Sequence, residues 1–393
     1  MIWVSDMTRT VKALRPTRRT ASSARLRLGH AGRHPAGRVD RRAFGVRNHL
    51  IEEQTMNSSD SDKEQPFAHQ PVMQDEVVDL FSAVPPGIVV DATVGGAGHS
   101  HALLSAHSHI RIVGLDQDPT AVKAARSRLS VFGDRAVVVH SRFDYLKPVV
   151  SSLAVEEGRI EEGSIEEISG VLFDLGVSSH QFDQPDRGFS YRFEAPLDMR
   201  MDPNSTTTAA DLVNDLGETE LAEILHTYGD ERFSRRIAKA ITTSRPIATT
   251  TELAEIVRGA IPAPARRTGG HPAKRTFQAL RLVVNDELNV LPPALEAALS
   301  LLAPGGRCVV LAYHSGEDRI VKAHFRRAAT GGCTCPQGLP CVCGAKPTVR
   351  LLKQGSRKPS SAEVESNPRS ESARLRAVEK IPVIEVPTFG GSR

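Results

Sequence analysis

The stretch Asp91-Ala-Thr-Val-Gly-Gly-Ala-Gly-His-Ser100 decides the fold. It follows an apolar run, Ile88–Val90, that is typical of a buried strand, and it precedes a helix-like segment, His99–His107. A glycine-rich turn between a strand and a helix lets a ligand approach the bare backbone, with the N–H groups of the helix facing it. The stretch therefore predicts a ligand-binding turn at the end of the first strand of an α/β sheet.

A second apolar run, Ile112–Leu115, ends in the acids Asp116 and Asp118. Asp116 follows the glycines by roughly 20 residues, the spacing at which a strand-end carboxylate accepts hydrogen bonds from both hydroxyls of a ribose. Loop, helix and acid in this order predict a site for an adenosine-containing cofactor. The alternative is a glycine-rich turn that serves packing only.

The spacing of the glycines separates two cofactor classes. A dinucleotide site needs a third glycine, which packs the helix on the strand beside the pyrophosphate. Counted from Gly96 and Gly98, that position is His101. S-adenosylmethionine contains ribose and adenine but no pyrophosphate. The sequence therefore favours it over NAD, and an NAD-dependent oxidoreductase is the less favoured alternative.

The rest of the chain continues the alternation of strands and helices. The predicted segments after Asp118 are a helix over Pro119–Leu129, strands over Ala136–Val139, Gly170–Asp174 and Gly306–Tyr313, a helix over Asp318–Ala329, and strands near Val349–Leu352 and Arg376–Ile381. Such alternation, with ligand groups at the carboxyl ends of strands, predicts a doubly wound parallel sheet.

The alternation stops between the fourth and fifth strands. From Thr207 to Ala265 the sequence carries only helix signals, one of them a capping-type start at Thr249-Thr-Thr-Glu252. A long helix over Thr276–Leu302 is predicted to follow. We therefore predict an all-helical domain for substrate recognition, residues 201–265, inserted into a sheet domain made of residues 66–200 and 266–393.

The first 65 residues differ from the rest in charge. Residues 1–50 hold twelve basic side chains and two acids, so the net charge of +4 for all 393 residues becomes −6 after Leu50. The segment lacks helical or strand periodicity, which predicts a disordered basic tail. An organellar transit peptide and a start codon assigned too early, with Met56 as the true start, are the alternatives. The sequence contains no run of about 18 apolar residues, so no membrane span is predicted.

Several long motifs carry a specific resemblance. They are Asp174-Leu-Gly-Val-Ser-Ser-His-Gln-Phe-Asp183, Arg187-Gly-Phe-Ser190, Pro196-Leu-Asp-Met-Arg-Met-Asp202, His271-Pro-Ala-Lys-Arg-Thr-Phe-Gln-Ala-Leu-Arg281, Val284-Asn-Asp-Glu287, Tyr313-His-Ser-Gly-Glu-Asp-Arg319 and Asn367-Pro-Arg-Ser370. From His69 to Lys380, in order, they resemble the bacterial 16S ribosomal RNA cytosine-N4 methyltransferases, the RsmH (MraW) family. The resemblance implies a Rossmann-like methyltransferase with an inserted helical domain. It also implies a cytoplasmic enzyme that uses S-adenosylmethionine to methylate the exocyclic amine of a cytosine in the decoding region of 16S rRNA.

The resemblance also assigns cofactor contacts. They fall on Gly95, Gly96, Ala97, Gly98 and His99 of the loop, and on Asp116, Phe143, Asp174 and Gln181. Phe143 is expected to stack on or flank the adenine, and Asp174 to lie near the methionine amino group or the reacting amine. Two positions depart from the family pattern. Ala97 stands where glycine is frequent, and His180 where proline is usual, which puts the loop geometry near His180 in doubt.

Methyl transfer from a sulfonium to nitrogen needs no metal and gains most from positioning. Cytosine N4 is a weak nucleophile because its lone pair is delocalised into the ring, so the site has to accept an N–H hydrogen bond as charge develops. Asp174 is the candidate catalytic acceptor, with Ser178 and Ser179 as neighbours, and a purely cofactor-binding Asp174 is the alternative. A DNA amine methyltransferase is disfavoured because its usual (Asn/Asp)-Pro-Pro-(Tyr/Phe) turn is replaced by Asp174-Leu-Gly-Val177.

Basic residues in loops are the candidate RNA contacts. They are Lys274, Arg275, His314, Arg319, Arg369, Arg374 and Arg376. Singly each is an ordinary solvated charge, whereas a cluster at one rim would bind phosphates. Two roles stay open for His314: capping the next helix, or binding the cytosine, which is expected to leave its stack. The expected partner is 16S rRNA within the 30S subunit, and a non-catalytic RNA-binding assembly factor is the alternative.

Four of the five cysteines lie together. Cys333, Cys335, Cys341 and Cys343 form two C-x-C pairs on a Gly/Pro-rich loop, whereas Cys308 lies alone in a predicted strand. Four thiolates can bind one tetrahedral zinc ion, although the usual spacing is C-x-x-C. A structural zinc ion and a loop of free thiols are therefore both open, and a cytosolic enzyme would seldom keep disulfides here.

Overall fold

The computed structural model describes residues 71–157, 167–177, 181, 184–267, 270–336 and 342–382. All of them fall within the unit Phe67–Arg393. The predicted basic tail, as well as Ser178, Ser179, His180 and Cys341, lies outside the described residues. Within the described part of the chain, no helix combines the length and the apolar character that crossing a membrane requires.

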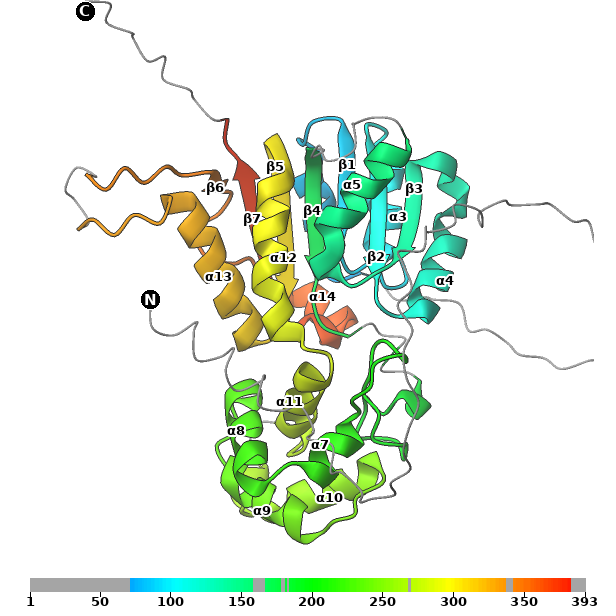
Figure 1. Cartoon of the computed structure of the whole chain (residues 1–393), viewed down its shortest axis with the longest axis vertical. Coiled ribbons are helices and arrows are strands. Elements are labelled where there is room, and N and C mark those ends of the chain that lie inside the picture. Colours follow the sequence, from blue (N-terminus) through cyan, green and yellow to red (C-terminus); the bar gives the residue numbers. More distant parts are fainter. Residues whose placement is uncertain are drawn as a thin grey trace, which may run out of the picture. The chain divides into compact units, whose positions relative to one another are not determined.

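The described residues form one seven-stranded sheet (Figure 1). Its strands are β1 (Gly87–Asp91), β2 (Ile110–Asp116), β3 (Ala136–His140), β4 (Ile168–Asp174), β5 (Leu302–Ala312), β6 (Val349–Leu351) and β7 (Arg374–Lys380). Their order in space is β3-β2-β1-β4-β5-β7-β6. Strands β1 to β5 are parallel, as predicted. Strand β7 runs back between β5 and β6, antiparallel to both.

Helices cover both faces of this sheet. They are α2 (Gln74–Phe81), α3 (Gly98–Ala106), α4 (Pro119–Leu129), α5 (Leu146–Glu156), α12 (Glu287–Leu301), α13 (Ser315–Thr330) and the short α14 (Ser361–Ser366). Buried side chains of α2, α3 and α4 form one hydrophobic cluster with the sheet. Those of α5, α12 and α13 form a second cluster, and these three helices lie in front of the strands in Figure 1. The doubly wound architecture is thus confirmed.

The order of strands locates the ligand-binding edge. β1 is paired with β2 on one side and with β4 on the other; the chain runs from β1 through β2 to β3 on the first side and then crosses to β4 and β5 on the second. In open α/β sheets, ligands bind outside the carboxyl ends of strands at such a switch point. Asp91, Asp116 and Asp174 are the last residues of β1, β2 and β4, so three acids lie at this edge.

A helical segment occupies the chain between β4 and β5. It contains α7 (Ala209–Asp215), α8 (Glu218–Gly229), α9 (Ser234–Thr243), α10 (Thr250–Ala260) and α11 (Lys274–Val284). Its buried residues, from Phe189 to Leu280, form a third hydrophobic cluster. The predicted capping start is present: the Thr249 hydroxyl accepts from the Glu252 amide, and the Glu252 carboxylate accepts from the Thr249 amide. We propose that the inserted domain includes α11 as well as residues 201–265.

The predicted long helix Thr276–Leu302 is wrong, because the chain breaks at Asn285 and Asp286. Asp286 has a φ of 56°, in the left-handed region, and separates α11 from α12. The Asn285 side chain donates to the Met199 carbonyl (2.8 Å) and accepts from the Met201 amide (2.7 Å). Side chains of this type compete with helical hydrogen bonds and stop helices. The break lets α11 pack in the helical segment and α12 on the sheet.

Candidate functional site

The loop after β1 is anchored by the buried carboxylate of Asp91, which is only 2% exposed. It accepts hydrogen bonds from the Ser100 hydroxyl (2.6 Å) and the Thr93 amide (3.4 Å). Burial raises the pKa of Asp91, and the hydrogen bond from Ser100 opposes that rise. Because both donors belong to the loop or to α3, Asp91 ties the glycine-rich turn to the end of the strand.

The loop has the tight backbone that its glycines predict. Gly95 and Ala97 have φ values of 48° and 57°. Ala97 therefore adopts a conformation that costs an L-residue roughly 1–2 kcal/mol and glycine nothing. At Gly98, a Cβ atom would lie 2.5 Å from Cγ of Pro71, so no side chain fits there. The Gly96 carbonyl accepts from Arg128 (3.1 Å).

Asp116, the predicted ribose acid, lies directly against this loop. Its Oδ2 accepts from the Gly95 amide (2.9 Å), and its Oδ1 accepts from the Asp118 amide (2.9 Å). Burial raises the pKa of Asp116 to about 6, although both backbone hydrogen bonds lower it. Each carboxylate oxygen keeps a second lone pair. The geometry leaves Asp116 able to accept further hydrogen bonds beside the loop backbone.

Asp118 and Gln181 form a buried support behind the site. Asp118 is 1% exposed and caps α4 by accepting from the Thr120 amide (2.9 Å). Its other oxygen accepts from the Gln181 amide group and from Arg187, both at 2.9 Å. Gln181, a predicted cofactor contact, is therefore held by α4 and by the start of the segment that leads to the helical domain.

Asp174 lies at the carboxyl end of β4, next to the β1 loop. Its Oδ1 accepts from the Tyr313 hydroxyl (2.6 Å), and its Oδ2 lies 3.6 Å from Nε2 of His99. Its amide donates to the Thr93 hydroxyl (2.7 Å). The Asp174 side chain keeps 28% of its surface exposed. It is thus both oriented by neighbours and open to a ligand.

Burial and the hydrogen bond to Asp174 keep the Tyr313 hydroxyl protonated. Desolvation, the charge of Asp174 and the hydrogen bond to it raise the pKa of Tyr313 well above its usual value. Tyr313 is therefore a fixed donor to the carboxylate. Sequence reasoning missed this role, since Tyr313 stands 139 residues from Asp174 and only the β4–β5 pairing brings them together.

His99 and Phe143 complete the rim. His99 is 5% exposed, and both of its ring nitrogens are buried without a hydrogen-bond partner in the described part of the chain. Phe143 follows β3 and packs edge-on against Phe173, with ring centroids 5.8 Å apart. Buried polar atoms are normally hydrogen-bonded. The unpartnered nitrogens of His99, beside Asp174, therefore indicate a place for a polar ligand group.

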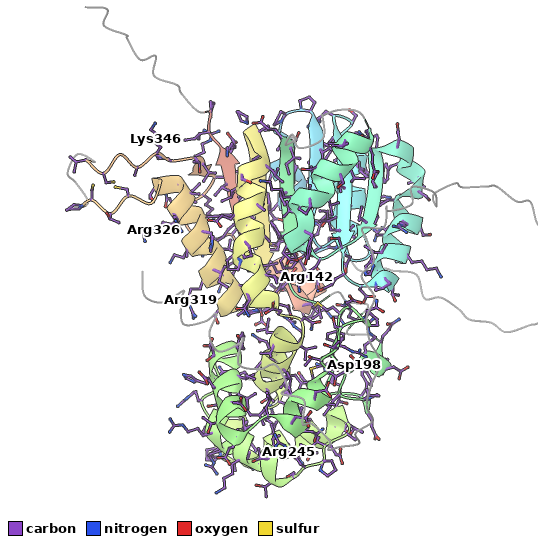
Figure 2. All side chains as sticks on the ribbon, in the orientation of Figure 1. Arg142, Asp198, Arg245, Arg319, Arg326 and Lys346 are labelled. Carbon is purple, nitrogen blue, oxygen red and sulfur yellow. The ribbon has the colours of Figure 1, made fainter. Side chains whose placement is uncertain are left out.

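The predicted RNA contacts do not form one free cluster. Arg376 forms a bidentate ion pair with Asp318 (2.7 and 3.0 Å). Arg275 donates to the Asp230 carbonyl (2.8 Å), and the Asp230 carboxylate accepts from Ser315 at the start of α13. Lys274, Arg319 and Arg369 are exposed, Arg374 is half-buried, and Figure 2 labels Arg319 on α13. As RNA contacts they all remain predictions.

His314 caps α13. Its Nδ1 accepts from the amides of Gly316 (3.1 Å) and Glu317 (3.4 Å), so Nε2 carries the proton and faces Glu317 at 3.1 Å. Although burial alone would raise the pKa of Glu317, the neighbouring His314 and the backbone donor of Tyr313 hold it below its usual value. The structure shows the capping role, and a further contact with cytosine stays a prediction.

Three of the four clustered cysteines meet in space. The Sγ atoms of Cys333, Cys335 and Cys343 all lie within 4.8 Å of one another. Cys308 is fully buried in β5, and desolvation raises the pKa of its thiol far above the usual value, so it stays a neutral core residue. The predicted grouping of the loop cysteines is therefore confirmed for the three that the structure describes.

These features define the class of protein. A doubly wound sheet, a glycine-rich loop after β1 and an acid at the end of β2 form an adenosine-cofactor site at the switch point. A family model described as the MraW methylase family matches residues 66–381. The chain belongs to this family, whose members are S-adenosylmethionine-dependent methyltransferases.

Relatives match almost over their whole length. The "Ribosomal RNA small subunit methyltransferase H" of Heliobacterium modesticaldum is 50% identical over 320 residues, which cover 80% of this chain and 99% of the relative. The protein of the same name from Acidothermus cellulolyticus is 52% identical, with 80% and 94% covered. A solved structure of an rRNA methylase from Streptococcus thermophilus is 12% identical, with a TM-score of 0.33, and the match covers 79% of this chain and 94% of that one. This similarity is too distant to support an inference.

Proposed function

We propose that this enzyme transfers the methyl group of S-adenosylmethionine to the exocyclic N4 amine of a cytosine in the decoding region of 16S rRNA. One observation carries the proposal: a partly exposed carboxylate, Asp174, is fixed by Tyr313 beside the β1 loop and Asp116. The names of relatives at about 50% identity support the small-subunit rRNA as substrate. Among the residues that the structure describes, no contact favours a non-catalytic RNA-binding role.

The residues of the site fit the cofactor. Asp116 would accept hydrogen bonds from the ribose hydroxyls, and the loop Gly95–His99 would cover the cofactor with backbone. Phe143 would flank the adenine, and Gln181 would hold the wall of the site through Asp118. The unpartnered nitrogens of His99 and the open carboxylate of Asp174 would meet the charged methionine end.

The bound cofactor supplies an electrophilic methyl group on a positively charged sulfur. In the transfer, a bond would form between cytosine N4 and the methyl carbon while the carbon–sulfur bond breaks and leaves its electron pair on sulfur, and N4 would then release one proton to water. Asp174 would accept an N–H hydrogen bond from N4 and direct its lone pair at the methyl group. Tyr313 keeps the carboxylate in that orientation. Positioning and charge stabilisation of this kind supply most of the acceleration.

The test uses 30S subunits that lack the modification, with labelled S-adenosylmethionine and nucleoside analysis of the rRNA. Label in N4-methylcytidine is the expected result. No label on 30S subunits, despite cofactor binding, would reject the ribosomal substrate. Label on protein-free 16S rRNA but not on 30S subunits would reject the assembled particle as the substrate. Because the proposed substrate is ribosomal, we expect the enzyme to work in the cytoplasm.

We also propose that the loop cysteines bind one structural zinc ion. Thiolates bound to one zinc at about 2.3 Å lie about 3.8 Å apart, a spacing compatible with the cluster of Cys333, Cys335 and Cys343. Cys341 would be the fourth ligand by its C-x-C spacing. The site lies in the connection between α13 and β6, so a metal there would stabilise a loop rather than take part in methyl transfer.

Substitution Cys335→Ser is expected to abolish stoichiometric zinc, because three thiolates hold zinc much less tightly than four. Elemental analysis of protein purified without chelators should give about one zinc per chain for the wild type and much less for the variant. Cys308→Ala, in the core, is the control and should keep the metal. A wild-type protein without zinc, or equal zinc in all three, would contradict the proposal.

A further inference from the structure

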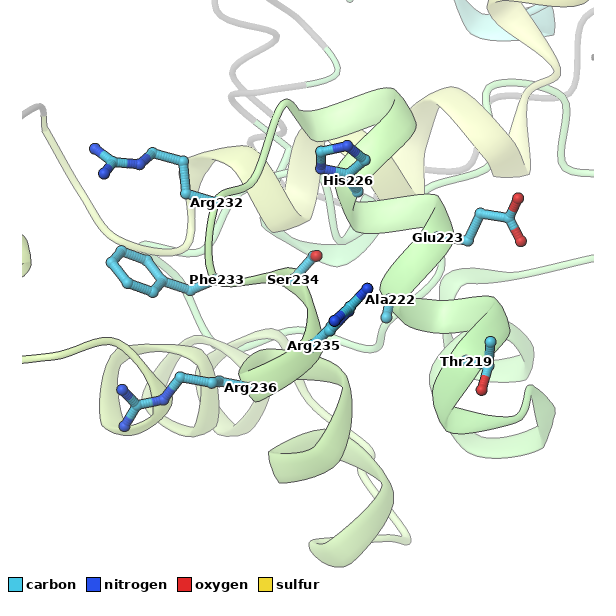
Figure 3. A pocket seen from close by; sticks show the side chains of 9 residues that line it. All are labelled: Thr219, Ala222, Glu223, His226, Arg232, Phe233, Ser234, Arg235 and Arg236. Atoms are coloured by element: carbon cyan, nitrogen blue, oxygen red, sulfur yellow. The ribbon is translucent and has the colours of Figure 1, made fainter.

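A basic groove on the helical segment has no part in the site described so far. It is a cavity of about 550 Å³ between α8 and α9. The residues that line it are Thr219, Ala222, Glu223, His226, Arg232, Phe233, Ser234, Arg235 and Arg236 (Figure 3). Three arginines against a single carboxylate, Glu223, give the lining of the groove a net positive charge.

The sequence of α9 explains why these charges face outward. Ile237, Ala238 and Ile241 are buried in the third hydrophobic cluster, so the opposite face of the helix presents Arg235, Arg236 and Lys239. These three residues and Arg232 are exposed. In the part of the chain that the structure describes, none of the four side chains donates a hydrogen bond or forms an ion pair.

Other arginines of the helical segment have partners. Arg200 pairs with Asp198, Arg258 with Glu255, and Arg281 with Glu287. Surface charges gain little from such pairs, but unpaired arginines keep all their donors for a ligand. Guanidinium groups match phosphate geometry and bind it bidentately. The pattern therefore favours a phosphate-bearing partner.

An aromatic ring lies among these charges. Phe233 is half-buried, and in Figure 3 the side chains of Arg232, Phe233 and Arg236 project on the same side of the groove. Single-stranded nucleic acids bind to this combination, with phosphates on basic side chains and a base stacked on an aromatic ring. An acidic protein segment would use the arginines but would not need the ring.

The groove is also connected to the sheet domain. Asp230, two residues before Arg232, accepts from Ser315 at the start of α13 and, through its carbonyl, from Arg275 of α11. Gly229 packs so closely that a Cβ there would lie 2.7 Å from the Arg275 carbonyl. The end of α8 is thus fixed against α11, and a ligand in the groove would be held in register with the β5–α13 junction.

We propose that the groove between α8 and α9 binds the sugar–phosphate backbone of a single-stranded segment of ribosomal RNA, with one base stacked on Phe233. The inference rests on the proposed rRNA substrate. It assigns a second RNA-binding surface of the enzyme, at a distance from the site where the base reacts. Arg232, Arg235, Arg236 and Lys239 contact phosphates. Their loss weakens RNA binding and leaves the cofactor site untouched.

The test compares the double variant Arg235→Gln/Arg236→Gln with the double variant Arg326→Gln/Arg327→Gln. Both pairs are adjacent exposed arginines on a helix, and Figure 2 labels Arg326 on α13. Binding to a protein-free 16S rRNA fragment that contains the decoding region is measured between low and physiological salt. The first variant should bind at least tenfold more weakly. The slope of log K against log salt should fall by about 1.4, about 0.7 per lost phosphate contact on a single strand.

Three further readouts make the result decisive. S-adenosylmethionine affinity should be unchanged in both variants, and methyl transfer to 30S subunits should show a raised KM with kcat nearly unchanged in the first. Phe233→Leu, which keeps apolar bulk, should weaken RNA binding several-fold without changing the salt slope. Wild-type methylation of 30S subunits establishes the proposed function separately, so its failure would be distinguishable from failure of the groove.

The following outcomes would overturn the inference. Wild-type affinity and salt slope for Arg235→Gln/Arg236→Gln would show that the groove does not contact RNA. An equal loss in Arg326→Gln/Arg327→Gln would show a general effect of net charge. Weakened binding to 30S subunits with unchanged binding to protein-free RNA would assign the groove to a ribosomal protein instead.

Discussion

Asp116→Ala is expected to weaken S-adenosylmethionine binding about 100-fold. The carboxylate is placed to accept from both ribose hydroxyls, and a hydrogen bond to a charged group contributes about 1.5–3 kcal/mol. Two such bonds correspond to about 3 kcal/mol, and each 1.4 kcal/mol is about tenfold in affinity. Isothermal titration calorimetry measures the dissociation constant directly.

Asp116 also supports the loop, so a second variant is needed. In Asp116→Ala the amides of Gly95 and Asp118 lose their acceptor, which destabilises the fold as well as the site. Asp116→Asn removes the charge and replaces one of the two acceptor oxygens by an NH2 donor, so one of the two backbone amides keeps its acceptor. It should still bind the cofactor at least tenfold more weakly. Asp134→Asn, on an exposed carboxylate before the amino end of β3, is the control. Wild-type affinity in Asp116→Asn would remove Asp116 from the cofactor site.

The raised pKa of Asp116, about 6, gives this prediction a pH dependence. A ribose diol binds the ionised carboxylate, so cofactor affinity should be constant above pH 7 and fall as the pH drops through 6. The effect on folding has the opposite sign. Because the folded pKa lies above the unfolded value of 3.8, protonation of Asp116 stabilises the fold below that value, and this stability is lost as the pH rises through 6. Asp116→Asn should remove the inflection in affinity near pH 6.

Local patterns predicted most elements of the sheet domain. Helix α4 runs from Pro119 to Leu129 as expected, because Asp118 caps it and Pro119 fits its first turn. The break between α11 and α12 was missed because the apolar pattern continues across it. Asn285 stops the helix through bonds to Met199 and Met201, more than 80 residues away in sequence. The antiparallel direction of β7 could not be predicted either, because it depends on the strand's position in the sheet, between β5 and β6.

The site was predictable where the chemistry is local. The loop and Asp116 are joined by a 2.9 Å hydrogen bond, at the place that the strand–turn–helix spacing indicated. The supports of the site were not predictable. Tyr313 reaches Asp174, and Arg187 reaches Asp118, only through the tertiary structure. Arg376, a predicted RNA contact, also pairs with Asp318 on α13, which its place in the sequence did not indicate.

The second large effect is expected for Asp174→Asn, which should lower the rate of methyl transfer about 100- to 1000-fold. Removing one group that stabilises developing charge in an active site costs about that much. Asparagine keeps the size of the side chain and can still accept from the Tyr313 hydroxyl. It cannot stabilise the positive charge that grows on N4. Single-turnover transfer to 30S subunits, at saturating cofactor, measures this step.

Tyr313→Phe separates the orientation of the carboxylate from its charge. It removes the 2.6 Å hydrogen bond to Asp174 and keeps the carboxyl group itself. The rate should fall about tenfold, the scale of a hydrogen bond worth about 1.5 kcal/mol. The described hydrogen bonds of Tyr313 go to Asp174 and Glu317 and not to the loop or to Asp116, so its loss should leave cofactor affinity within a few-fold of the wild type.

The two variants together decide between the roles of Asp174. If the carboxylate accepts from the reacting amine, Asp174→Asn lowers the single-turnover rate far more than it weakens cofactor binding, and the double variant with Tyr313→Phe is no slower than Asp174→Asn alone. Tyr313 acts only through the carboxylate, so without the charge it has nothing left to orient. If Asp174 binds only the methionine end, cofactor affinity falls instead, and saturating S-adenosylmethionine restores the rate. That result would move the acceptor to another residue of the site.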